Sequence, residues 1–170
     1  MKSLSVVLKG IDKISIFLGK LFSITTIIIM ILQVTEIVLR YILKSPTIWI
    51  WELCVYLYGA AFVMAGAWVL QEDLHVRTDL LINNLNDRQR AFLDMIMYPP
   101  LVFVFIFVMT PAQISAAIHS FLIKETSFNA WGPPLYHFKA ILSLGFVIFG
   151  LQAAANWIRS IVLVFKGVEI

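Results

Sequence analysis

Four long apolar runs decide what this chain can fold into. They cover residues of about 14–41, 48–70, 91–118 and 138–165, and short polar stretches separate them. A helix needs roughly 20 apolar residues to cross a bilayer, so each run is long enough for one crossing. Charged residues make up only 14% of the chain, against about 25% in an average soluble domain. We therefore predict an integral membrane protein with a single four-helix transmembrane domain over residues 1–170.

Prolines and a tryptophan mark features within and between these runs. Pro46 lies between the first two runs, where it ends a helix, and Trp49 opens the second run as an interfacial aromatic residue. Pro99, Pro100 and Pro111 interrupt the third run. Membrane helices tolerate proline because neighbouring helices satisfy the freed carbonyl groups. The third helix is therefore predicted to be long and bent.

The stretch 71–90 alternates charged and apolar side chains. This pattern predicts an amphipathic connection that lies on the membrane surface between the second and third helices. Asn86 or Asp87 is suited to cap the helix that follows. The predicted fold is all-α, with four long and tilted transmembrane helices plus this surface-lying connection.

The distribution of positive charge predicts the orientation. If both termini share one side, that side holds nine Lys and Arg residues and the other side holds four. Because Lys and Arg mark cytoplasmic segments, we expect both termini in the cytoplasm. The nine residues are Lys2, Lys9, Lys13, Lys20, Arg77, Arg88, Arg90, Arg159 and Lys166. The four residues are Arg40, Lys44, Lys124 and Lys139.

Residues suited to catalysis or metal binding are scattered along the chain. It contains no nucleotide-binding, zinc-protease or serine-hydrolase motif. Cys54 is the only cysteine and lies in an apolar run. His75 is expected on the opposite face of the membrane from His119 and His137, which excludes a three-histidine metal site and leaves a two-histidine outer site as the alternative. We predict no catalytic, cofactor or metal site and no nucleic-acid partner.

Polar residues inside the first two runs are more informative. Gln33, Glu36 and Arg40 follow helical spacing and share one face of the first helix, and Glu52 lies one turn into the second run. A charge in a bilayer requires a partner or water, so these residues indicate assembly or function. Two partners for Arg40 remain open, Glu36 on its own helix and Glu52 across the hairpin. The alternative hypothesis is a proton or ion relay.

An ordered set of residues resembles a known family. It comprises Trp51-Glu52-Leu53, Gly59-Ala60-Ala61, His75-Val76-Arg77-Thr78-Asp79-Leu80-Leu81, Arg88-Gln89-Arg90-Ala91-Phe92-Leu93-Asp94, Trp131-Gly132-Pro133-Pro134, Lys139, Gly145 and Gln152. The set resembles the small membrane (DctQ-like) subunit of tripartite ATP-independent periplasmic (TRAP) transporters. The resemblance implies a multi-pass protein of the bacterial inner membrane.

The resemblance also implies partners. A periplasmic substrate-binding protein captures an organic acid with a carboxylate or sulfonate group. A large permease subunit moves this acid by an elevator-type motion driven by sodium. The small subunit packs against the permease as a scaffold in the lipid bilayer. The family's sodium and substrate sites lie in the large subunit.

Candidate roles follow from the resemblance for residues expected to make structural or partner contacts. Glu52 with Arg40 would brace the first hairpin, beside Glu36. The other candidates would fix the inner connection (His75 and Asp79), stiffen the outer loop where the binding protein docks (Trp131, Pro133 and Pro134) or add polar contacts there (Lys124 and Glu125). The acidic stretch Gln71-Glu72-Asp73 departs from the family, which often has a basic residue before this histidine.

Two other functions are compatible with four membrane helices. In the first, the chain forms a small oligomeric channel or exporter and lines the path itself. In the second, it anchors a membrane enzyme or redox complex, which predicts bound haem or quinone. The separated histidines do not favour haem ligation.

Overall fold

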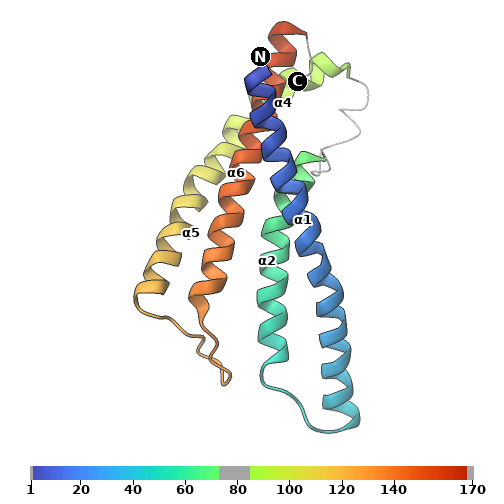
Figure 1. Cartoon of the computed structure of the whole chain (residues 1–170), viewed down its shortest axis with the longest axis vertical. Coiled ribbons are helices and arrows are strands. Elements are labelled where there is room, and N and C mark those ends of the chain that lie inside the picture. Colours follow the sequence, from blue (N-terminus) through green and yellow to red (C-terminus); the bar gives the residue numbers. More distant parts are fainter. Residues whose placement is uncertain (1, 73–84, 168–170) are drawn as a thin grey trace.

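The computed structural model describes residues 2–72 and 85–167 of the chain. These residues form helices that fold into two long hairpins (Figure 1). The helices are α1 (Lys2–Ile37) with the π-helical turn η1 (Val38–Ile42), α2 (Ile50–Gln71), α4 (Asp87–Met97), the π-helical turn η2 (Tyr98–Phe103), α5 (Val104–Leu122) and α6 (Leu135–Lys166). The prediction of an all-α protein with four helices able to span a membrane is confirmed.

The helical stretches extend beyond the apolar runs in most places. The four candidate spans are Leu4–Ile42, Ile50–Gln71, Arg88–Leu122 and Leu135–Lys166. At 1.5 Å per residue, the 36 residues of α1 reach about 54 Å, whereas α2 reaches only about 33 Å. Because α1 begins at Lys2, the lysines near the start of the chain lie within this helix and not before it.

Local chemistry explains several helix boundaries. Asn86 caps α4 in a capping box with Gln89, so of the two predicted caps the structure contains Asn86. The third span changes to a π-helical turn where Pro99 and Pro100 occur, because proline cannot donate the backbone hydrogen bond that an α-helix requires. The amphipathic connection predicted over 71–90 falls largely outside the described residues.

The helices pack in an order that differs from the order of the chain. Helix α6 contacts α2, α5 and α4, while α1 packs against α2 and α6. The first buried cluster joins α2 and α6 through Met64, Ala67 and Ile148, with Leu18 and Phe22 of α1 packed against it. A second cluster, centred on Leu70, Tyr98 and Ala153, joins α2 and α6 to η2. The core therefore follows α6.

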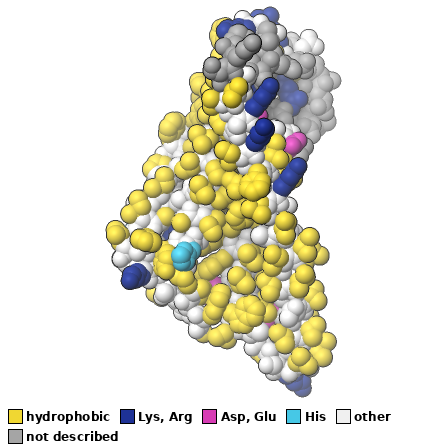
Figure 2. All heavy atoms as spheres, viewed as in Figure 1, with side chains coloured by type: hydrophobic (Ala, Val, Ile, Leu, Met, Phe, Trp, Pro, Cys, Tyr) yellow, Lys and Arg dark blue, Asp and Glu magenta, His cyan; other side chains and the backbone are white. Residues whose placement is uncertain are grey.

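The two ends of the molecule differ in shape (Figure 1). Both termini lie at one end, where α1, α4 and α6 come together, and we call this the termini end. The two hairpins diverge towards the other end, which carries the loops 43–49 and 123–134 and which we call the loop end. Figure 2 shows hydrophobic side chains over most of the visible surface and a gathering of Lys and Arg near the termini end.

Candidate functional site

Glu36 connects the last turns of the first helix to the loop after it. Its Oε1 accepts a hydrogen bond from Arg40 Nη2 at 2.5 Å, and its Oε2 accepts one from the Thr47 hydroxyl at 2.5 Å. Only 8% of Glu36 is exposed. A charge-assisted contact in so little water is stronger than a neutral one. Of the two partners left open for Arg40, the structure contains Glu36 on its own helix.

Glu52 has different neighbours from those that the resemblance implied. It lies in the first turn of α2 and is 5% exposed, and its Oε1 accepts a hydrogen bond from the Tyr56 hydroxyl at 3.0 Å. Its Oε2 has no hydrogen-bond partner within the described part of the chain. The expected Glu52–Arg40 contact is therefore corrected: Tyr56, one turn further along α2, takes the place of Arg40, which is held by Glu36.

The loop 123–134 is a compact structure. Lys124 ends the preceding helix with a φ of 49°, and Glu125 N donates to Ser120 O at 3.0 Å, as in a Schellman motif. Ser127 N donates to Pro133 O, and Leu135 N donates to Glu125 O, both at 2.9 Å. These paired bonds fold the loop back on itself.

Side-chain contacts hold this loop against the helices. Glu125 pairs with Lys139 of α6 at 2.5 Å. The hydrogen bond from the Lys139 ammonium holds the pKa of Glu125 below its usual range. Trp131 approaches Trp49 at the start of α2, with ring centroids 6.4 Å apart.

The predicted loop residues therefore come together in one place. Trp131, Pro133 and Pro134 share the folded loop with Lys124 and Glu125. Phe128, at 100% exposure, is the most open large apolar side chain of this loop. His75 and Asp79 lie outside the described residues.

A polar cluster at the termini end was not predicted from the sequence. Asp12 of α1 receives two hydrogen bonds from Arg159 of α6, at 2.6 and 3.1 Å. Gln152 donates to Asp12 at 3.0 Å and accepts from Ser15 at 2.8 Å. Asn156 donates to Leu70 O, the carbonyl of the last turn of α2, at 2.7 Å. We call these residues (Asp12, Ser15, Gln152, Asn156 and Arg159) the polar clasp.

The polar clasp joins three helices where they are buried. Ser15 and Gln152 are 0% exposed, and every polar atom in such a site needs a partner. A signal for it was present in the sequence, because Gln152, Asn156 and Arg159 follow each other at intervals of four and three on one face of α6. Asp12 gave no such signal, since its partners lie about 140 positions away in the chain.

Close contact between the helices occurs at glycine residues. A Cβ atom on Gly19 would lie 2.5 Å from Trp68 Cβ, and one on Gly145 would lie 2.5 Å from Val63 Cγ1. Separations this short are not tolerated, so only glycine lets α1 meet α2, and α6 meet α2, at these points. The small residues at these crossings therefore set the interhelical distances.

The described side chains provide no group of three or more metal-ligating residues. The geometry is that of a multi-span membrane protein whose polar residues hold helices and loops together. A family model described as "Tripartite ATP-independent periplasmic transporters, DctQ component" matches residues 29–163, and no curated protein matches the chain. The chain belongs to this family, which is one of transporter components and not of enzymes.

Proposed function

We propose that this chain is the accessory scaffold subunit that pairs with the large permease of a TRAP transporter. In this proposal a periplasmic binding protein delivers an organic acid with a carboxylate or sulfonate group, and a sodium gradient drives its uptake through the permease. The observation that carries the proposal is the DctQ family match over residues 29–163. The geometry adds three supporting arguments.

The first argument is the open arrangement of the helices. Helix α5 packs on α6, and α1 packs on α2 and α6, so the hairpins lie beside one another instead of closing around a common axis. Large apolar side chains are exposed on every span, for example Ile27 (60%), Phe62 (69%), Phe107 (75%) and Leu144 (52%). Such surfaces favour contact with lipid and with another helix bundle over the lining of an aqueous path.

The second argument is the cross-linking of the helices at the termini end. An elevator mechanism requires one body that stays fixed while another slides. The polar clasp ties α1, α2 and α6 at one level, and the glycine crossings at Gly19 and Gly145 lock the same helices together. These contacts resist relative sliding of the helices, as a scaffold requires.

The third argument concerns the binding protein. With the termini in the cytoplasm, as the charge distribution predicts, the loop end faces the periplasm. The loop 123–134 is stiffened by its own backbone hydrogen bonds and by the Glu125–Lys139 pair. A rigid, exposed loop loses little conformational entropy on binding, which favours it as a docking surface.

The test is reconstitution with the permease and binding protein encoded beside this chain. Proteoliposomes containing all three proteins should accumulate a radiolabelled carboxylate or sulfonate under an inward sodium gradient, and those without this chain should accumulate little or none. An affinity tag on the chain should co-purify the permease. Accumulation by vesicles that contain only this chain would instead support a channel or exporter and overturn the proposal.

A further inference from the structure

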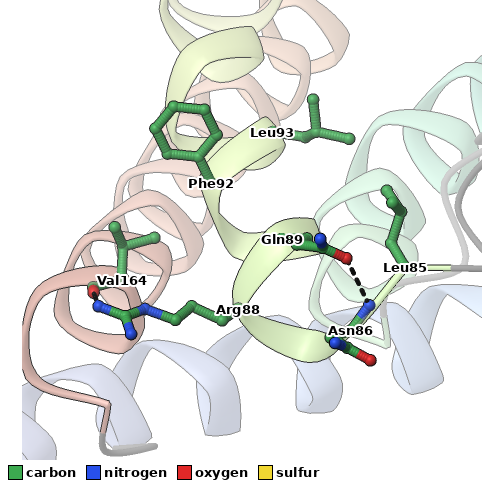
Figure 3. Close-up of a pocket in the computed structure, with 7 residues that line it drawn as sticks. All are labelled: Leu85, Asn86, Arg88, Gln89, Phe92, Leu93 and Val164. Atoms are coloured by element: carbon green, nitrogen blue, oxygen red, sulfur yellow. Dashed lines mark hydrogen bonds between the residues drawn. The ribbon is translucent and has the colours of Figure 1, made fainter.

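A cleft opens at the termini end between the start of α4 and the end of α6. Its volume is about 610 Å³. Figure 3 shows the side chains that line it, with Arg88 reaching across to α6 and Phe92 and Leu93 further along α4. The lining residues are Leu85, Asn86, Arg88, Gln89, Phe92, Leu93 and Val164.

The polar wall of the cleft presents hydrogen-bond donors. Arg88 Nη2 donates to Val164 O at 3.0 Å, which fixes the guanidinium across the cleft. Among the residues that the structure describes, Val164 O is the one acceptor it meets, so its other N–H groups can serve a ligand. The side-chain oxygens of Asn86 and Gln89 accept backbone N–H groups in the capping box. Their amide NH₂ groups take no part in these two bonds. None of the seven lining residues carries a carboxylate, so the wall is suited to an anion.

The other wall is apolar and continues towards the membrane-spanning part of the helix. Phe92 lies about one helical turn beyond Arg88 and is 48% exposed, and Leu93 is 37% exposed. Ile96, the next residue on this face, is 45% exposed. A guanidinium followed after one turn by exposed apolar side chains matches the boundary between lipid headgroups and acyl chains.

We propose that this cleft binds one anionic phospholipid, with the phosphate on Arg88 and an acyl chain along Phe92 and Leu93. Charge complementarity supports this occupant. Arg90 and Lys166, close in sequence to the lining residues, add positive charge, so that with Arg88 three basic residues stand against two acidic ones, Asp87 and Asp94. Basic sites next to transmembrane helices on the cytoplasmic side are suited to such headgroups.

Native mass spectrometry of the full chain in detergent tests the proposal. The chain should retain added phosphatidylglycerol in clear excess over phosphatidylcholine of the same acyl chains. Arg88→Gln should weaken phosphatidylglycerol binding about tenfold, because it removes the charged donor. Arg88→Lys should give an intermediate value, since a point charge remains but the guanidinium fork is lost.

Two controls separate the cleft from general charge and from the headgroup alone. Lys44→Gln removes an exposed cation at the loop end and should leave phosphatidylglycerol binding unchanged. Phe92→Ala should weaken lipid binding while the chain remains folded by circular dichroism. Equal binding of both lipids, unchanged binding in Arg88→Gln, or complete displacement of the lipid by inorganic phosphate would overturn the proposal.

Discussion

The two ends of the molecule hold the same helices in different ways. At the termini end, α1, α2 and α6 are joined by the polar clasp, with buried hydrogen bonds from side chain to side chain and from side chain to backbone. At the loop end the hairpins diverge (Figure 1). At that end the two hairpins contact each other through aromatic side chains. These contacts include the stacked rings of Tyr56 and Phe138, whose centroids are 4.8 Å apart, and the Trp49–Trp131 pair.

This difference indicates at which end the relative positions of the helices are fixed and at which end they can adjust. A hydrogen bond in a dry site depends on distance and angle, so the polar clasp specifies one arrangement of three helices. Aromatic pairs remain favourable over centroid separations of about 4.5–7 Å, so they tolerate small shifts. We therefore expect the termini end to behave as a rigid joint. At the loop end we expect the spacing between the two hairpins to adjust to a partner, while the loop 123–134 itself stays rigid.

The largest expected effect is at the polar clasp. Breaking a fully buried ion pair costs about 3–5 kcal/mol. Because 18% of Asp12 and 25% of Arg159 side-chain surface remains exposed, we expect Asp12→Ala to lower the free energy of unfolding by about 2 kcal/mol. Denaturant titration in mixed micelles measures this change in the free energy of unfolding. A double-mutant cycle with Arg159→Ala that yields no coupling energy would contradict a direct interaction.

A slightly smaller effect is expected where α1 crosses α2. Gly19→Ala would place Cβ against Trp68. Overpacking of this kind costs about 1–3 kcal/mol, and the gain in helix propensity offsets about 0.5–1 kcal/mol of it, so we expect a net loss of about 1–1.5 kcal/mol. Gly10 is the matched control on the same helix, because nothing lies within 4 Å of the position its Cβ would take. Gly10→Ala should instead stabilise the helix by about 0.5–1 kcal/mol. Melting temperatures that fall equally for both variants would argue against the close crossing.

At the loop end we expect a weaker response to a comparable change. Phe138→Leu removes the ring that stacks on Tyr56 but keeps an apolar side chain, so a loss of about 1 kcal/mol is expected. The distribution of distances between spin labels on the two loops should become broader in this variant. The distribution between labels on α1 and α6 at the termini end should keep its width. A loss as large as that of Asp12→Ala would remove the contrast between the two ends.

The smallest effect concerns pH. Lys139 holds the pKa of Glu125 below its ordinary value, so the pair stabilises the loop above the unfolded-state pKa, and this contribution is lost as pH falls through the lower folded-state pKa. Carbon-13 NMR of the labelled carboxyl group should give a pKa that rises in Lys139→Met. A titration of Glu125 that is identical in both proteins would exclude the ion pair in solution.

Features that depend on local sequence could be predicted, and features that depend on distant residues could not. Hydropathy located the four helices, since a span is a property of one segment. Asn86 was one of two predicted caps, with Asp87, because residue type alone suits both to the position. The partner of Arg40 stayed open because two carboxylates were within reach on sequence grounds. The orientation of the chain remains a prediction.

The polar clasp illustrates the limit of such reasoning. Arg159 counts as one more positive charge near the end of the chain until the fold brings Asp12 beside it. The resemblance implied a loop stiffened by Trp131, Pro133 and Pro134, whereas the hydrogen bonds from Glu125 N and Ser127 N depend on a specific backbone path. Sequence patterns report composition along a helix face, whereas these contacts require the relative placement of two elements.

The modest length of α2 has a consequence for the membrane in which this protein works. Its 22 residues reach about 33 Å, close to a hydrocarbon layer of about 30 Å, so α2 can tilt less than the longer helices before its ends leave the lipid. The longer helices bound to it must either slant across it or emerge from the lipid. The length of α2 therefore limits the bilayer thickness that the chain can match, and a change in lipid chain length would alter the tilt of all the helices packed on α2.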